Sequence, residues 1–328
     1  GSGGGSGFAP QVVGDSVYAA APSGSVVKVD LATGAVRWQA NAGVKLSAGV
    51  GSDGQVTAVA APDGTVIAYD DQGAEKWRVR ASSEVDIPPT VGNGVVVVRS
   101  SDYRIQAFDA GSGEALWNVQ RPGPALALKT NMRMIMIEGL LISGLPNGKF
   151  IAINAHTGAV QWEGTVSVSQ GATDLERISD VVGSPQTQGA LLCGVSYQGR
   201  MACFDVSQGG RLLWDKPFSS ATGMTTDSQQ AYAADQRSVV YSFALGDGHE
   251  LWKQTALRNR GLSAPAAVPQ GLAVGDMEGY VHFLSRSDGQ LLGRVQVGGG
   301  AIVSPLTATS RGVLVQTGNG NLVLIGVN

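Results

Sequence analysis

The chain has little charge and few reactive side chains. Of its 328 residues only 15% are charged, the formal net charge is −3, and there are three histidines and two cysteines. This balance lacks the basic surface that nucleic-acid binding requires. No apolar run approaches the roughly 18 residues that a membrane-spanning helix needs. Composition therefore argues against nucleic-acid-binding and membrane-spanning proteins.

The two cysteines, Cys193 and Cys203, lie symmetrically about Gln198, which belongs to a predicted turn. They are predicted to face each other across a hairpin. An oxidising compartment would allow them to form a disulfide, but we favour their interpretation as two small buried hydrophobic side chains. Since there is no Cys-x-x-Cys spacing, neither a zinc site nor a thioredoxin-like motif is expected.

What the sequence has in abundance is glycine, at 47 residues, together with an internal repeat. A unit of about 40 residues recurs, and such a period is typical of propeller blades. Every tryptophan occupies the same place in its unit: Trp38, Trp77, Trp117, Trp162, Trp214 and Trp252. The seventh unit has Gly293 at this place, and the eighth stops before reaching it.

Each unit contains the same succession of short apolar stretches and turns. Pairs such as Ser23-Gly24 and Asp63-Gly64 suit tight hairpins, and a later turn follows an Asp or Asn such as Asp30. We predict an all-β, eight-bladed β-propeller with four-stranded antiparallel blades, forming a single domain over residues 8–328. The tryptophans are expected to wedge between blades, and the aspartates to bond turn amides.

The two ends of the repeat array are incomplete. The eighth unit, from residue 321 onward, lacks its outermost strand, and residues 1–7 read GSGGGSG. This opening is interpreted as a Gly/Ser-rich linker or as a native N-terminal connection. It precedes a strand rather than a helix, so it is not expected to be a phosphate-binding loop.

Two long spacings interrupt the repeat, and their extra residues flank one blade. The first contains residues 121–139, with Leu126 and Leu128 preceding Lys129. The second contains residues 169–185, where charged side chains gather: Asp174, Glu176, Arg177 and Asp180. Apolar anchors beside orienting charges are typical of a protein–protein interface. A solvated loop with its leucines in the core is the alternative.

The Asp-x-x-x-Gly-x-x-x-Trp pattern of DLATGAVRW resembles the PQQ-like propeller repeat, which is related to WD-type repeats. The stretches ATDLERISDVVGSP and GDMEGYVHFL resemble the BamB family, the propeller lipoproteins of the outer-membrane β-barrel assembly machinery. The resemblance covers nearly the whole chain after residue 8. In that family a lipid-bearing cysteine begins the mature chain, and residues 1–7 contain none.

The resemblance implies a non-enzymatic scaffold at the periplasmic face of the outer membrane. It implies docking on a POTRA domain of BamA, the barrel-inserting subunit, and assistance to unfolded outer-membrane proteins. The family's contact stretches carry over to these partner-binding positions: Leu126, Leu128, Lys129, Arg177 and Asp180, with Glu176 from the charge cluster. Val182 stands where the family can have a second acidic residue, and lysine at 129 would pair less well with a carboxylate than arginine.

Two other functions are weighed against docking. A quinoprotein dehydrogenase dependent on PQQ would need an oxygen-rich calcium site and commonly has adjacent cysteines, and neither is evident. A generic ligand-binding periplasmic propeller is the second alternative. His156, His249 and His282 lie on different blades, the first two in turns expected to be exposed. We therefore expect no enzyme activity, catalytic residue, cofactor or metal.

Overall fold

The computed structural model describes residues 8–127 and 131–326, and these form eight antiparallel sheets whose strands pair in chain order. The first four sheets contain β1 (Gln11–Val13), β2 (Ser16–Ala20), β3 (Ser25–Asp30), β4 (Val36–Asn41); β5 (Gly51–Ser52), β6 (Thr57–Ala60), β7 (Thr65–Tyr69), β8 (Glu75–Arg80); β9 (Thr90–Gly92), β10 (Val95–Arg99), β11 (Arg104–Asp109), β12 (Ala115–Gln120); and β13 (Ile135–Ile137), β14 (Leu140–Gly144), β15 (Lys149–Asn154), β16 (Val160–Thr165).

The last four sheets contain β17 (Val181–Gln188), β18 (Leu191–Ser196), β19 (Gly199–Asp205), β20 (Arg211–Phe218); β21 (Met224–Thr226), β22 (Gln230–Ala234), β23 (Val240–Ala244), β24 (Glu250–Gln254); β25 (Ala266–Val268), β26 (Gly271–Gly275), β27 (Tyr280–Leu284), β28 (Leu291–Gln296); and β29 (Thr307–Thr309), β30 (Gly312–Gln316), β31 (Leu322–Ile325). Among the described residues the sole helix is the 3₁₀ turn η1 (Val206–Gln208). The prediction of an all-β, eight-bladed propeller is confirmed.

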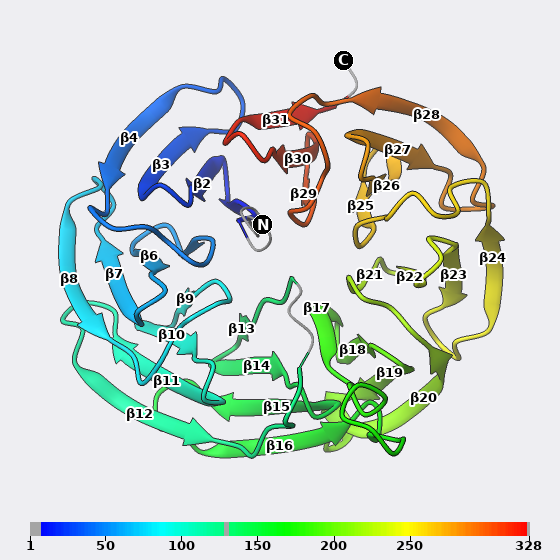
Figure 1. The fold of residues 1–328 in the computed structure, drawn as a ribbon, viewed down its shortest axis with the longest axis horizontal. Helices are drawn as coiled ribbons and strands as arrows, with labels where there is room; N and C mark the ends of the chain where they lie inside the picture. The colour runs from blue at the N-terminus through cyan, green and yellow to red at the C-terminus, as the bar shows by residue number, and fades with distance from the viewer. Residues whose placement is uncertain (1–7, 128–130, 327–328) are drawn as a thin grey trace. The chain divides into compact units, whose positions relative to one another are not determined.

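The chain packs as two compact units. Of the described residues, unit 1 comprises 8–123, 132–142 and 152–161, and unit 2 comprises 124–127, 131, 143–151 and 162–326. Within each unit the first strands of successive sheets lie side by side, as the order β17, β21, β25 and β29 illustrates in unit 2 (Figure 1). The expectation that residues 8–328 form a single domain stays a prediction.

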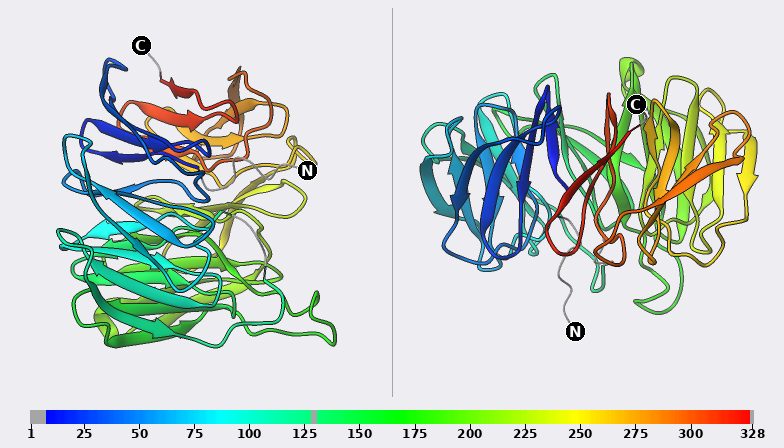
Figure 2. Two further views of the ribbon diagram at one scale, coloured as in Figure 1. Left: turned by 60° about the vertical axis from the view of Figure 1, so that its left-hand side comes forward. Right: turned by 90° about the horizontal axis from the view of Figure 1, so that it is seen from above.

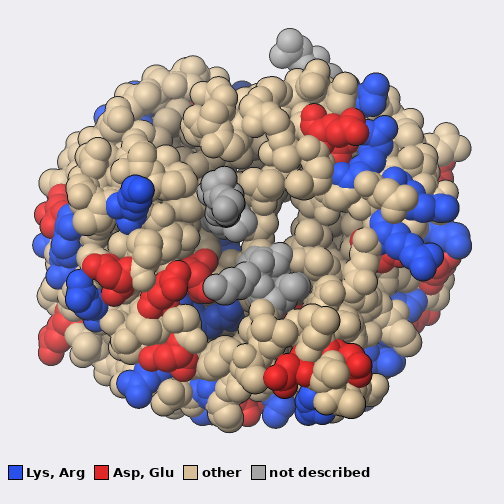
Figure 3. Space-filling model, in the orientation of Figure 1, with Lys and Arg blue, Asp and Glu red and all other residues tan. Residues whose placement is uncertain are grey.

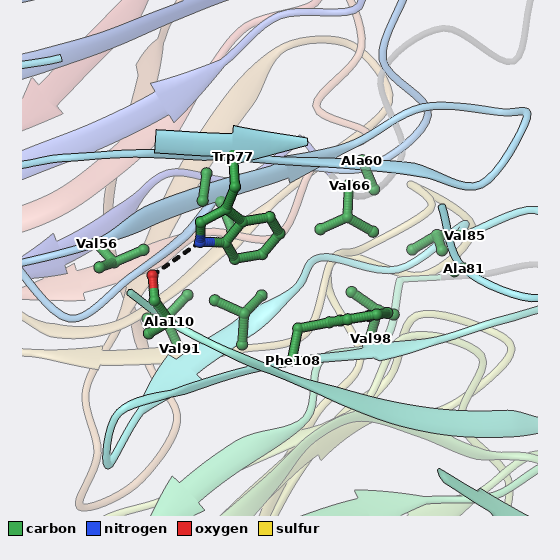
Figure 4. Packing of buried hydrophobic residues seen from close by; sticks show 13 residues of the cluster. Val56, Ala60, Val66, Trp77, Ala81, Val85, Val91, Val98, Phe108 and Ala110 are labelled. Carbon is green, nitrogen blue, oxygen red and sulfur yellow. Dashed lines mark hydrogen bonds between the residues drawn. The ribbon is translucent and has the colours of Figure 1, made fainter. Parts of the chain in front are cut away.

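The repeated tryptophans link each sheet to the next. The Trp77 indole donates to the Ala110 carbonyl at 2.9 Å and packs against Phe108 and Val91 in a buried apolar cluster (Figure 4). A Cβ on Gly113, where φ is +77°, would lie 2.8 Å from the Trp77 ring, so only glycine fits beneath it. The same pairing recurs throughout: Trp38 with Gly73, Trp77 with Gly113, Trp117 with Gly158, Trp162 with Gly210, Trp214 with Gly248, and Trp252 with Gly289. The predicted wedges are confirmed.

The turn before each tryptophan strand is held by its first polar side chain. Asp30 Oδ1 accepts from the amides of Ala32 and Thr33, both at 3.0 Å. Asn154 Oδ1 accepts in the same way from the amides of His156 and Thr157, both at 3.0 Å. These carboxylates and amides are therefore turn-forming groups, as the sequence predicts, rather than catalytic acids.

The two cysteines correct a sequence interpretation. Cys193 on β18 lies directly opposite Cys203 on β19, and the two form a disulfide with a Cα–Cα distance of 4.1 Å. The hairpin pairing and the burial of both side chains agree with expectation. The favoured interpretation as unbridged hydrophobic residues is wrong. Opposite positions of an antiparallel pair bring the two Cβ atoms close enough for their sulfur atoms to bond.

The last sheet has three strands among the described residues, β29, β30 and β31, in agreement with the prediction that the eighth unit lacks its outermost strand. The preceding strand, β28, carries Gly293 in place of tryptophan, and a Cβ there would meet nothing within 4 Å. The exposed strand β28 also presents Leu291 and Leu292 to solvent. The seventh repeat thus has no indole at the position that tryptophan occupies in the six repeats before it.

Candidate docking surface

The first irregular segment follows β12, where Pro122 and Pro124 prevent further strand pairing. Leu126, the predicted anchor within it, has 41% of its surface exposed. Leu128 and Lys129 lie outside the described residues. Of the apolar pair in this segment, the described leucine is therefore available at the surface rather than packed in the core.

Most of the second irregular segment lies in the loop of residues 166–180, which connects β16 to β17 and stands away from the strands (green in Figure 2). Its tip is a turn stabilised by reciprocal side-chain bonds. Glu176 donates its amide to Thr173 Oγ1 at 3.2 Å, and its carboxylate accepts from the Ala172 amide at 3.0 Å. This arrangement resembles a helix capping box, and it gives the exposed tip a defined conformation.

Apolar and charged side chains share this exposed tip. Leu175 is 65% exposed, and Val168, nearer the start of the segment, is 67% exposed. Arg177 is also exposed, donates to the Gly171 carbonyl at 3.4 Å, and forms no ion pair with a described residue. Leu175 and Val168 were not singled out from the sequence. Their signal is an apolar residue in a polar insertion that belongs to no strand repeat.

The base of the segment is fastened to the sheet beneath it. Gln198 Nε2, in the β18–β19 turn, donates to the carbonyls of Leu175 and Ile178, each at 3.1 Å. The Ser169 and Ser179 hydroxyls lie 2.7 Å apart. Two separate ties thus hold the ends of the projecting tip, so that it is presented as a fixed surface.

Asp180 differs from its expected placement beside Arg177. Its residue is 0% exposed, and its carbonyl accepts from the Tyr197 amide at 2.9 Å. Glu176 and Arg177, which precede Asp180 by four and three residues, are exposed. The charge cluster read from the sequence therefore divides into an exposed part at the tip and a buried carboxyl group at the base.

The two irregular segments converge at the start of β17. The Asn131 carbonyl, at the end of the first segment, accepts from the Gly183 amide at 3.0 Å. The Asn131 side chain donates to the Val303 carbonyl at 2.9 Å. The expectation that the two insertions are neighbours is thus met at their bases, both of which belong to unit 2.

The three histidines and the potential metal ligands have the following surroundings. The described residues contain no group of three or more His, Cys, Asp or Glu side chains that could hold a metal ion. His156 and His249 are exposed in turns, as expected, whereas His282 is buried with its Nε2 2.7 Å from Asp276 Oδ2. In the part of the chain that is described, no helix has the length and apolarity to cross a membrane.

Eight consecutive antiparallel sheets joined by Trp–Gly contacts define a β-propeller of the PQQ-like repeat class. The chain belongs to the family of outer membrane protein assembly factor BamB, whose model matches residues 22–254 and 236–328.

Individual relatives agree with this assignment. The chain is 64% identical to outer membrane protein assembly factor BamB of Bordetella pertussis over 328 residues, which cover 100% of this chain and 85% of that protein. It is 38% identical to BamB of Burkholderia pseudomallei over 323 residues, covering 98% and 84% of the two chains. The crystal structure of BamB from Moraxella catarrhalis superposes with a TM-score of 0.89 at 27% identity, covering 96% and 94%.

Proposed function

We propose that this chain is a non-enzymatic scaffold of the outer-membrane protein assembly machinery and docks on a periplasmic POTRA domain of BamA. The assembly role follows from membership of the BamB family and from the named relatives. The protein acts at the periplasmic face of the outer membrane, where a lipid anchor on the full-length protein would hold it. Unfolded outer-membrane proteins are its indirect clients.

The observation that carries this proposal is the projecting tip of residues 166–180. Exposed Leu175 supplies an apolar anchor, and Arg177 supplies a cation that forms no ion pair with a described residue. Leu126 lies on the first irregular segment. In that segment the Asn131 carbonyl accepts from the amide of Gly183 in β17, the strand that follows the tip. Interfaces combine a desolvated apolar centre with polar groups that fix orientation, and this surface offers both.

Each contact residue predicted from the sequence has a part in this proposal. Leu126 and Leu128 are the apolar contacts, Lys129 and Arg177 pair with carboxylates of the partner, and Glu176 shapes the tip through the Ala172 amide. Asp180 acts from beneath the surface, because it is fully buried where the segment joins β17. Substituting Asp180 would therefore test the stability of the base rather than a direct contact.

Calorimetric titration of the chain with the POTRA region of BamA from the same organism tests this function. Leu175→Asp and Arg177→Glu should each weaken binding by at least about ten-fold, because they place a charge at an apolar anchor or reverse a pairing charge. Val206→Asp is the matched control, since Val206 is 48% exposed on the same sheet, in the turn between β19 and β20.

Normal binding by folded Leu175→Asp and Arg177→Glu proteins would contradict the docking surface. Equal loss in the Val206→Asp control would contradict its location. Absence of any binding by the folded parent chain would contradict the choice of BamA as partner.

A further inference from the structure

A cleft of ≈ 430 Å³ lies in unit 2. One of its residues, Ser219, accepts from the amide of Gln198, the residue that also holds the projecting tip. The walls of the cleft come from neighbouring sheets. The end of β20 contributes Lys216 to Ser219, the β22–β23 turn contributes Asp235 to Arg237, and Tyr241, Phe243 and Glu250 complete the lining. The Gln236 side chain bonds the Ser219 hydroxyl at 2.6 Å and thereby joins the two walls.

The residues of this cleft depart from the repeat. Phe218 pairs with Gly199 at the register position that Ala42 and Ala81 occupy opposite Gly24 and Gly64. In two further sheets this position holds valine, Val166 and Val297. Those alanines are 1% and 6% exposed, whereas Phe218 is half-buried and reaches the surface. Phe218 thus carries an aromatic ring where these four sheets have alanine or valine. It packs partly against the buried cluster that contains Phe243 and leaves the rest of its ring exposed.

Three aromatic rings form the apolar part of the cleft. Phe218 meets Tyr241 edge-on, with ring centroids 5.4 Å apart and an interplanar angle of 88°. It meets Phe243 similarly at 5.7 Å, while Tyr241 and Phe243 stack at 5.9 Å. Phe243 is buried, but Phe218 and Tyr241 are partly exposed. Edge-to-face clusters of this kind readily accept a further aromatic ring.

The Lys216 ammonium is already occupied within the cleft. It lies 4.1 Å from the Phe243 ring centroid and donates to the Gly248 carbonyl. Burial lowers the pKa of Lys216. The Asp235 carboxylate is likewise committed, because its Oδ1 accepts from the amides of Arg237 and Val239 at 2.9 and 3.0 Å.

The exposed charges at the rim are two arginines and one carboxylate, that of Glu250. Arg237 and Arg258 are exposed, and neither side chain bonds or pairs with a described residue. They lie close together because the Asn259 amide donates to the Arg237 carbonyl at 2.9 Å. Lys and Arg side chains gather over β22–β24 and the segment leading to β25, on the right of the face in Figure 3. This rim is complementary to a partner with acidic groups.

We propose that this cleft is a second binding site, which takes an aromatic side chain from an extended, acidic segment of a protein partner. The ring would pack against Phe218 and Tyr241, and carboxylates on flanking residues would pair with Arg237 and Arg258. The residues that line the cleft are distinct from Leu126, Leu175 and Arg177 of the proposed BamA surface.

The test uses the full chain and three peptides followed by NMR titration: acetyl-Gly-Glu-Phe-Glu-Gly-amide, the same peptide with alanine for phenylalanine, and the same peptide with lysine for both glutamates. The first peptide should shift resonances of Phe218 and Tyr241 and bind at least about ten-fold more tightly than the other two. Phe218→Ala, which removes the ring and gives the residue found at 42 and 81, and Arg237→Glu should each remove this preference.

Arg311→Glu is the matched control, because it makes the same charge change in the β29–β30 turn and should leave peptide binding intact. Equal binding of the alanine peptide would overturn the aromatic site, and equal binding of the lysine peptide would overturn its acidic specificity. Unchanged binding by Phe218→Ala would overturn its location. Saturable binding of a glycan such as chitotetraose in place of the peptides would overturn the protein partner.

Discussion

A single hydrogen bond distinguishes two tryptophans that otherwise occupy equivalent positions. Trp77 donates its indole N–H to the Ala110 carbonyl, whereas the buried Trp38 N–H has no hydrogen-bond partner. Trp38 instead packs between the rings of Tyr18 and Tyr69, each 6.3 Å away. Trp38 is thus held mainly by ring packing, and Trp77 by packing and a hydrogen bond.

We expect Trp77→Phe to lower the free energy of unfolding more than Trp38→Phe does, by about 1–2 kcal/mol. Both substitutions remove ring volume, but only Trp77→Phe removes a hydrogen bond, and Trp38→Phe removes an unsatisfied buried donor. Urea unfolding of the two variants measures the difference. Equal losses would show that the Ala110 bond contributes nothing net.

Among the paired strands, the β18–β19 hairpin has a covalent link in addition to its hydrogen bonds. Cys193 and Cys203 are buried beside Val195, Met201 and Trp214 in one apolar cluster. The same sheet holds the base of the projecting tip through the Gln198 side chain in its turn. A disulfide in this hairpin therefore restrains the element from which the proposed docking surface extends.

Replacing both cysteines by alanine should lower the free energy of unfolding by about 2–3 kcal/mol, since the bridge closes a loop of sequence separation 10. Urea unfolding with and without dithiothreitol is the measurement. The parent chain should lose stability on reduction, and the double variant should not respond. A parent chain whose stability is unchanged after full reduction, verified by thiol titration, would contradict this expectation.

Across the whole molecule the turn aspartates act together because the repeat multiplies them. The Arg37 side chain and the Thr33 amide hold the pKa of Asp30 down to about 2. Turn amides lower the pKa of Asp70 and Asp109 as well. A carboxyl group whose pKa is lower in the folded than in the unfolded state stabilises the fold above its unfolded pKa of about 3.9, and this stability is lost as pH falls.

The free energy of unfolding should therefore fall as pH decreases from about 4 towards 2. Combining Asp70→Asn with Asp109→Asn should reduce this dependence, because asparagine, which occupies the equivalent place at Asn154, keeps the turn without titrating. Urea unfolding at a series of pH values measures both slopes. Parallel slopes for the two proteins would assign the acid sensitivity to other groups.

The repeat made the fold predictable, whereas the candidate sites were only partly so. Six tryptophans at one repeat position, with Gly293 and the eighth unit continuing the array, indicated eight blades, and the same Trp–Gly packing recurs at six sheet junctions. Asp180 shows the limit: nothing in the residue order distinguishes its buried carboxyl group from exposed Arg177 three positions earlier. The cleft was missed because Phe218 and Tyr241 come from different sheets. Their rings meet only because those two sheets pack against each other.

The Trp–Gly contacts also have a direction. Each indole packs against a glycine turn that comes roughly one blade later in the chain, from Trp38 with Gly73 to Trp252 with Gly289. During synthesis, a newly made blade must therefore wait for its successor before its tryptophan is covered. A nascent chain would display one such unburied indole at a time, at its most recently completed blade. Gly293 ends this succession, because the seventh repeat has no indole to be covered.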